Sequence, residues 1–256
     1  MTTSTTPGKP RRRIRLWAVA VWLLLWQLGA MALNQKILLV SPVQVLLRLG
    51  ELLPQGGFWG AVGFSFWRIT LGFLLACAAG TALGVLSSRF WPVRDLCAPL
   101  MATVKSIPVA SFIILVLIWV PSRNLSIIIS FLMVTPIVYQ NVLGGISSMD
   151  RKLTEMADVF EVSFPRRLRY LYLPQVMPFF RSACAVGLGL CWKAGVAAEV
   201  IGLPDGSMGE QLYEAKAYLS TPDLFAWTVV IVLVSLVFEK LFLFLLDRLG
   251  RRLERG

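Results

Sequence analysis

Six long apolar segments constrain the fold of this chain more than any other feature of its sequence. They are residues 16–33, 61–86, 100–120, 125–146, 176–203 and 224–246. A helix of about 20 mostly apolar residues is long enough to cross the hydrocarbon core of a bilayer. A helix also satisfies its backbone hydrogen bonds within one segment, as the bilayer interior demands. The sequence therefore predicts an all-α, polytopic membrane protein with six transmembrane helices.

The overall composition agrees with a membrane protein. The chain is 57% hydrophobic and 15% charged, whereas soluble domains average about 45–50% and about 25%. The net charge of +11 would suit a nucleic-acid binder only if the basic residues clustered on a soluble face. They lie mostly in short stretches between the apolar segments, so we expect contact with membrane lipid and no nucleic-acid partner.

The distribution of basic residues predicts the orientation. With the N-terminus inside, 16 Lys and Arg residues fall in inner segments and four in outer ones, namely Lys36, Arg48, Arg123 and Lys216. An excess of Lys and Arg marks cytoplasmic segments, so both termini are predicted to be cytoplasmic. Residues 1–14 are expected to be a disordered basic tail, 15–250 a single transmembrane domain and 251–256 a second tail. The first apolar run is too long for a signal-peptide core and is expected to be retained.

Several residue types and motifs that catalysis would need are absent. The sequence contains no histidine and no GxxxxGK[ST] motif, and its only Gly-Lys pair, at 8–9, precedes proline. Histidine is the commonest general base, and the glycine-rich motif cradles nucleotide phosphates. The cysteines have no metal-binding spacing and are expected to be small core residues: Cys77, Cys97, Cys184 and Cys191. We therefore expect neither an enzyme nor a metal or cofactor site in this chain.

Small residues recur at every fourth position in two of the predicted spans. Residues at that spacing form one stripe on a helix, along which another helix can approach closely. The predicted helix-packing residues are Gly72, Ala76, Gly80 and Gly84 in the second span and Gly187 and Gly195 in the fifth. A functional interpretation is that the helices packed in this way line a translocation path.

Three charges lie deep in the predicted spans, where charge is costly and is a functional hypothesis by default. Lys105 precedes Ile107-Pro108, where proline can break the helix and free backbone groups beside a cation. Lys193 and Glu199 are six residues apart, which is about 240° around a helix, so they do not share a face. The candidate substrate-path residues are Lys105, Ser106, Pro108, Lys193 and Glu199.

Residues 147–175, between the fourth and fifth spans, form a polar stretch that the orientation places in the cytoplasm. Asp150 is the predicted N-cap of a helix that ends or bends before Pro165. A second short basic helix is expected to stop at Pro174. One face of the first helix is apolar and carries Met156, Val159, Phe160 and Phe164.

These two short helices have no core of their own. One interpretation is a helix that lies on the lipid surface, but such helices usually have a basic polar face. Here the flank of the first helix is acidic, with Glu155, Asp158 and Glu161. The other interpretation is that the apolar face fits into a groove of a partner protein.

This stretch resembles the cytoplasmic motif in the membrane-spanning subunits of binding-protein-dependent ABC importers. That motif begins Glu-Ala-Ala, has a glycine four residues after the second alanine, and ends Ile-x-Leu-Pro. Residues 155–157 (Glu-Met-Ala) match its opening and residues 171–174 (Leu-Tyr-Leu-Pro) its close, at the same spacing. Met156 and Leu171 are replacements, and Glu161 stands in place of the glycine. Glycine adopts positive φ freely and glutamate does not, so we expect a different turn there or a bend displaced to Phe164-Pro165.

The resemblance covers most of the chain beyond residue 35. Four further stretches look like the branch of the family that imports aliphatic sulfonates, taurine, nitrate or related small solutes. They are SPVQV (41–45), FWRITLGFLLACAAGTALG (66–84), SIPVASFIILVLIWV (106–120) and WKAGVAAEVIG (192–202).

The resemblance implies the type I ABC importer permease fold in a bacterial cytoplasmic (inner) membrane. It implies a homodimer that forms the path for a small polar or anionic solute, which an extracytoplasmic solute-binding protein delivers. ATP and Mg would bind a separate ATPase subunit, docked on the segment that matches residues 150–165, the coupling helix. The implied coupling residues are Glu155, Met156, Ala157, Val159, Phe160, Glu161, Phe164, Leu173 and Pro174.

The alternative is a secondary transporter, or another polytopic membrane protein, that acts without an ATPase. Secondary transporters often contain internal repeats, and no convincing repeat is visible in this sequence. The sequence does not name the solute.

Overall fold

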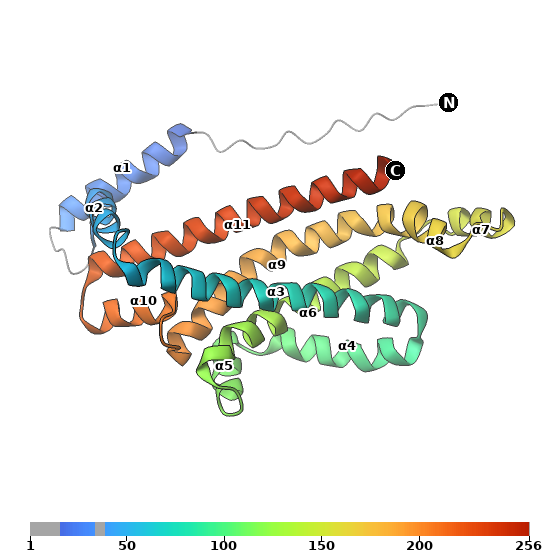
Figure 1. Ribbon diagram of the computed structural model, residues 1–256, viewed down its shortest axis with the longest axis horizontal. Coiled ribbons are helices and arrows are strands. Elements are labelled where there is room, and N and C mark those ends of the chain that lie inside the picture. The colour runs from blue at the N-terminus through green and yellow to red at the C-terminus, as the bar shows by residue number, and fades with distance from the viewer. Residues whose placement is uncertain (1–15, 34–38, 256) are drawn as a thin grey trace.

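The computed structural model describes residues 16–33 and 39–255, and all regular secondary structure in these ranges is helical (Figure 1). The elements are α1 (Leu16–Leu33), α2 (Pro42–Leu52), α3 (Gly56–Arg89), α4 (Trp91–Ser106), α5 (Val109–Leu117), α6 (Ser122–Ser147), α7 (Arg151–Val159), α8 (Phe164–Arg167), the π-helical turn η1 (Leu168–Tyr172), α9 (Leu173–Gly202), α10 (Met208–Ala217) and α11 (Thr221–Arg255). The tail expected at 1–14 and the final residue of the tail at 251–256 lie outside the described residues.

Four helical runs are long and apolar enough to cross a membrane: α3, α6, α11, and the continuous run of α8, η1 and α9. The bent pair of α4 and α5 raises this number to five if it is one span, and α1 is a shorter apolar helix. The predicted all-α, multi-pass membrane architecture is therefore confirmed. The number of six spans stays a prediction.

The third predicted span, residues 100–120, is not one helix. α4 begins earlier, at Trp91, and ends at Ser106, and α5 follows at 105° to it. Ile107 and Pro108, which separate the two helices, both have extended backbone, with ψ of 130° and 132°. Proline has no N–H to donate and disfavours helical backbone in the residue before it. The proline therefore ends the helix here rather than kinking it.

The core of the molecule lies where α3 and α9 pack against α6. Its buried side chains include Phe73 on α3, Val134 and Val138 on α6, and Leu188 on α9. The glycines of the predicted stripes lie at these contacts. A Cβ on Gly72 would be 2.4 Å from the carbonyl oxygen of Ile127, one on Gly80 2.8 Å from Val138 Cβ, one on Gly84 3.0 Å from Val142 Cγ1, one on Gly187 3.0 Å from Val134 Cγ1, and one on Gly195 2.7 Å from Ile69 Cγ1. Only residues without a Cβ allow the helices to approach this closely.

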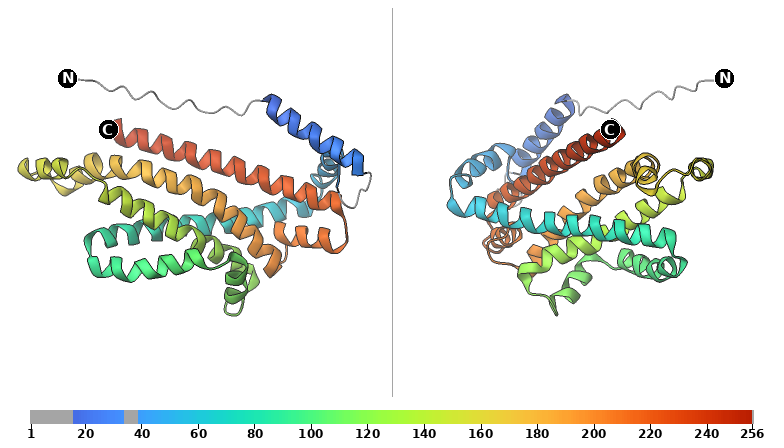
Figure 2. Two further views of the ribbon diagram at one scale, coloured as in Figure 1. Left: turned by 180° about the vertical axis from the view of Figure 1, so that it is seen from behind. Right: turned by 45° about the vertical axis from the view of Figure 1, so that its right-hand side comes forward.

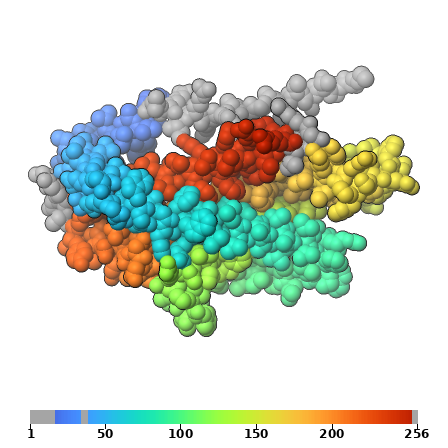
Figure 3. All heavy atoms as spheres, viewed as in Figure 1, coloured from blue at the N-terminus to red at the C-terminus, as the bar shows by residue number. Residues whose placement is uncertain are grey.

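The bundle is elongated, and its two ends carry different short helices. α7 and α8 lie at one end, and α2 and α10 at the other (Figures 1 and 2). In the space-filling view the yellow α7–α8 segment projects beyond the packed helices, and the α5 region projects from one side (Figure 3). α11 runs along the bundle and ends toward the side of α7.

Candidate functional site

α7 begins where the sequence predicts, but it ends earlier than expected, at Val159, and Phe164 is the first residue of α8. Asp150 is its N-cap, and its carboxylate accepts a hydrogen bond from the Lys152 amide at 2.9 Å. Glu155 forms an exposed ion pair with Arg151 at 3.1 Å, four residues apart on the same helix. Ala157 is the one buried residue of α7, so this helix depends on its cap and its neighbours in sequence more than on a core.

The apolar face predicted for this segment is exposed. The exposed fractions are 53% for Met156, 79% for Val159, 72% for Phe160 and 70% for Phe164. We call these four residues the α7 apolar face. Large apolar side chains that are exposed together at one end of a molecule are typical of an interaction surface. Met156, Val159 and Phe160 lie outside the helices that are long and apolar enough to cross a membrane, and Phe164 is the first residue of one of them. The α7–α8 segment that carries all four projects beyond the packed helices (Figure 3).

The turn after α7 keeps the geometry that glycine would favour. Glu161 has a φ of 47°, which is the left-handed region. Its amide donates to the Asp158 carbonyl at 3.1 Å, and the Val162 amide donates to the Ala157 carbonyl at 3.0 Å. This pair of bonds is the Schellman arrangement that closes many helices with a left-handed residue. Neither of the alternatives expected for Glu161, a different turn or a bend displaced to Phe164-Pro165, occurs.

Arg167 reaches back over this turn. Its Nη2 donates to the Ala157 carbonyl at 2.9 Å and its Nε donates to the Val162 carbonyl at 2.6 Å. Its Nη1 donates to the Asp158 carboxylate. In the sequence Arg167 is one of the 16 basic residues that orient the chain, and nothing in the local pattern shows which carbonyls its flexible side chain will bind.

The second short helix does not stop at Pro174, as the sequence suggested. α8, η1 and α9 form one helix of 39 residues over Phe164–Gly202. The turn before the proline is π-helical, and the Leu173 amide donates to the Leu168 carbonyl. Since proline cannot donate and crowds the preceding turn, a wider turn accommodates it without ending the helix. Leu173 and Pro174 therefore lie inside one long helix, at the start of its α9 part, instead of ending a short helix.

Lys105 lies at the break between α4 and α5. Its side chain is exposed, and its Nζ donates to Oε1 of Gln140 on α6. Ser106 and Pro108 beside it are exposed as well, and Ser106 Oγ donates to the Thr103 carbonyl at 2.9 Å. The break thus presents a cation and a hydroxyl group at the surface of the bundle.

Lys193 is exposed on α9, and no hydrogen bond or ion pair to it occurs within the described ranges. Its helix neighbours Leu190 and Ala197 pack into the same apolar cluster as Val104, the residue before Lys105. The two lysines therefore border one cluster, formed by α4, α5, α6 and α9.

Glu199 is separated from these lysines. It is fully buried, and its Oε2 accepts hydrogen bonds from Ser65 Oγ at 2.7 Å and from the Gly209 amide at 3.3 Å. Ser65 Oγ in turn accepts from the Met208 amide at 2.9 Å. The first amides of a helix have no partner within it and favour a negative charge. In this structure Glu199 therefore joins α9 and α3 to the beginning of α10.

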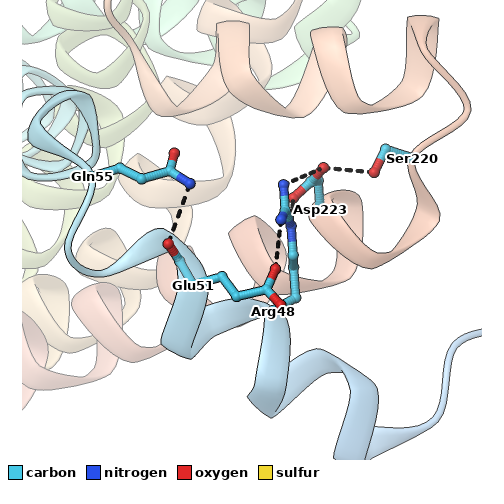
Figure 4. Close-up of polar contacts among 5 residues, drawn as sticks. All are labelled: Arg48, Glu51, Gln55, Ser220 and Asp223. Carbon is cyan, nitrogen blue, oxygen red and sulfur yellow. Dashed lines mark hydrogen bonds and ion pairs between the residues drawn. The ribbon is translucent and has the colours of Figure 1, made fainter.

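A second group of polar contacts joins α2 to the start of α11, just after the other end of α10 (Figure 4). Arg48 on α2 donates to the Asp223 carboxylate of α11 at 2.5 and 3.2 Å and to Glu51 at 2.6 Å. Ser220, just after α10, donates to Asp223 at 2.6 Å. The hydrogen bond to Asp223, and then that to Glu51, raises the pKa of Arg48 above its ordinary value. The contact between Arg48 and Asp223 links α2 to α11 across 175 positions of the sequence, a distance over which no local pattern predicts a pair.

The four cysteines are buried, as predicted, and their thiols are free. Within residues 16–33 and 39–255 there is no group of three or more His, Cys, Asp or Glu side chains that could hold a metal ion.

Most of the chain is similar to membrane subunits of known transport systems. The family described as "Binding-protein-dependent transport system inner membrane component" matches residues 69–255. A permease protein of Bacillus subtilis assigned to aliphatic sulfonates transport, SsuC, is 27% identical over 90% of this chain and 83% of its own. The taurine transport system permease protein TauC of Escherichia coli is 26% identical over 86% of this chain and 81% of its own.

The nitrate import permease protein NrtB of Synechocystis is 27% identical over 93% of this chain and 86% of its own. A chain in the crystal structure of an amino acid ABC transporter with histidines has a TM-score of 0.54 and 16% identity. It covers 81% of this chain and 96% of its own length, and at this identity the likeness shows the fold alone.

Proposed function

The chain belongs to the family of binding-protein-dependent transport system inner membrane components, and we propose that it is the permease subunit of an ATP-driven importer. Its relatives named above are transport permeases. The observation that carries the proposal is the α7 apolar face, which is exposed and lies, except for Phe164, outside the candidate membrane-crossing helices. A permease driven by a separate ATPase needs such a docking surface, and a secondary transporter does not.

The ATPase is proposed to dock on residues 150–165, with ATP and Mg bound by that partner. The contact residues are those of the α7 apolar face together with Glu155 and Glu161. Ala157 is buried and supports this surface from within, while Leu173 and Pro174 lie in the helix that leads away. The abundance of Lys and Arg on this side supports a cytoplasmic location for α7 and for both termini. Closure of the ATPases would carry α7 with it as a rigid body, which is one of the ways in which domains switch.

The translocation path is proposed to form between two copies of this chain in the bacterial cytoplasmic membrane. Lys105 and Lys193 support a polar or anionic solute, because exposed ammonium groups at membrane depth are costly unless they serve a path. Ser106 and Pro108, at the break, are proposed to line it with them. Glu199 is proposed to support the path from inside the bundle. An extracytoplasmic binding protein would deliver the solute at the end of the bundle that carries α2 and α10.

The test of this function is purification of the tagged chain from native membranes, with mass spectrometry of the co-purified proteins. The wild-type chain should bring down a P-loop ATPase, and Phe160→Asp together with Glu155→Lys should not, because the first change places a charge in the apolar face and the second reverses the charge beside it. Tyr218→Asp is the matched control, since Tyr218 is 82% exposed at the opposite end. Normal recovery of the ATPase with the double variant would refute the assignment.

A further inference from the structure

Arg167 connects two elements that little else holds together. Its guanidinium bonds to the Ala157 carbonyl and the Asp158 carboxylate in the last turn of α7. It also bonds to the Val162 carbonyl in the link between α7 and α8. Arg167 itself belongs to α8, the beginning of the helix over Phe164–Gly202. One side chain therefore spans the whole junction.

The orientation of α7 is not set by apolar packing. Among its residues only Ala157 is buried, and α7 has no extensive contact with any helix in the described part of the chain. Two connections remain between α7 and the long helix. One is the backbone turn through Glu161, and the other is the group of bonds made by Arg167.

The backbone turn alone is a weak joint. Glu161 is left-handed, a conformation that is unfavourable for a residue with a Cβ because the Cβ crowds the following carbonyl oxygen. The Ala157 carbonyl, which accepts the Val162 amide in this turn, also accepts Arg167. Hydrogen bonds from a charged donor are stronger than neutral ones, so the guanidinium can offset the cost of the left-handed glutamate.

We propose that Arg167 is a positioning residue that fixes the angle between α7 and the helix over Phe164–Gly202, so that the two move as one body. This inference rests on the proposed coupling role of α7. The long helix carries Gly187, Gly195 and Glu199 along its buried stripe. A displacement of α7 therefore reaches the core of the bundle through a continuous helix, provided that the junction does not bend.

The neighbouring arginine offers a matched control. Arg166 has the same charge and is exposed, whereas the Arg167 side chain is 21% exposed. Arg166→Gln removes one positive charge and no contact with α7. Arg167→Gln removes the same charge together with the hydrogen bonds to Ala157, Asp158 and Val162. Arg167→Lys keeps the charge but not the planar fork that reaches several acceptors at once.

The test uses hydrogen exchange and mass spectrometry on the full chain in nanodiscs, purified with its ATPase. In the wild type, trapping with ATP and vanadate should change exchange in residues 151–163 and in residues 164–172 together. Arg167→Gln and Arg167→Lys should speed exchange of residues 157–163 by about tenfold, the effect of losing charge-assisted bonds. In both variants the trapped change should stay in 151–163. Arg166→Gln should match the wild type in both respects.

A glycine at position 161 separates positioning from general folding. Glu161→Gly removes the cost of the left-handed residue, so it should restore part of the protection lost in Arg167→Gln. The inference is overturned if Arg167→Gln still transmits the trapped change to 164–172, or if Arg166→Gln loses it equally. Failure of the wild-type chain to bring down an ATPase would instead overturn the proposed function. Hydrogen exchange in the chain without an ATPase would still measure the protection that the Arg167 bonds give to residues 157–163.

Discussion

A glycine-to-alanine pair on α3 tests how the bundle is packed. Gly72 and Gly63 lie on the same helix, but their surroundings differ. A Cβ on Gly72 would lie 2.4 Å from the Ile127 carbonyl oxygen and 2.9 Å from Ser130 Cβ, whereas one on Gly63 meets nothing within 4 Å. The obstacle at Gly72 is backbone, which cannot rotate aside, so α6 must move.

The magnitude follows from the difference between the two variants. Both substitutions gain the same helix propensity, up to about 1 kcal/mol for Gly to Ala, so this contribution cancels. What remains is the overpacking at Gly72, which typically costs about 1–3 kcal/mol and occasionally more. Because the closest atom is a backbone oxygen, we expect the upper half of that range. At about 2–4 °C per kcal/mol for a chain of this size, Gly72→Ala should melt about 4–12 °C below Gly63→Ala.

The assay is thermal unfolding of both variants in the same detergent, followed by tryptophan fluorescence and by recovery on size-exclusion chromatography. Gly63→Ala should melt at or above the wild type. Equal melting temperatures for Gly72→Ala and Gly63→Ala would refute the reasoning, because they would mean that α3 and α6 are not in backbone contact at Gly72.

Three further substitutions test the polar contacts. Glu199→Ala should lower the free energy of unfolding by about 1–3 kcal/mol, because it leaves buried donors unpaired. Lys193→Ala, at an exposed position, should not. Equal losses in melting experiments would contradict the role of Glu199 in joining α9 and α3 to α10. Lys105→Ala should impair uptake of an anionic solute without lowering the melting temperature, and unchanged uptake kinetics would leave Lys105 a packing role. A double-mutant cycle on Arg48→Ala and Asp223→Ala should give a coupling free energy of up to about 1 kcal/mol, as for other partly exposed pairs. Fully additive losses would show that this pair does not join α2 to α11.

Features that depend on neighbours in the sequence could be predicted. The helical class follows from the length and hydropathy of the apolar runs. The N-cap at Asp150 and the exposed face around Phe160 follow from residues within two turns of each other. The Ile107-Pro108 pair also indicates that the helix can break there, but it does not predict the angle between α4 and α5. In each case the physical cause is local backbone chemistry or the periodicity of one helix.

Features that depend on distant residues could not be predicted in this way. Glu199 bonds to Ser65, 134 positions away, and Arg48 to Asp223, 175 positions away. The four-residue spacing puts Glu199 in line with Gly195 and away from Lys193, but no local pattern shows that its carboxylate meets Ser65 and the first amides of α10.

Position 161 shows where these two kinds of information meet. The sequence by itself determined that a turn should follow α7 and that glutamate is a costly residue for it. Only the tertiary structure decided that the left-handed turn is kept and that the Arg167 guanidinium donates to the Ala157 and Val162 carbonyls beside it. Backbone preference sets the cost of a conformation, and contacts made after the chain has folded decide whether that cost is met.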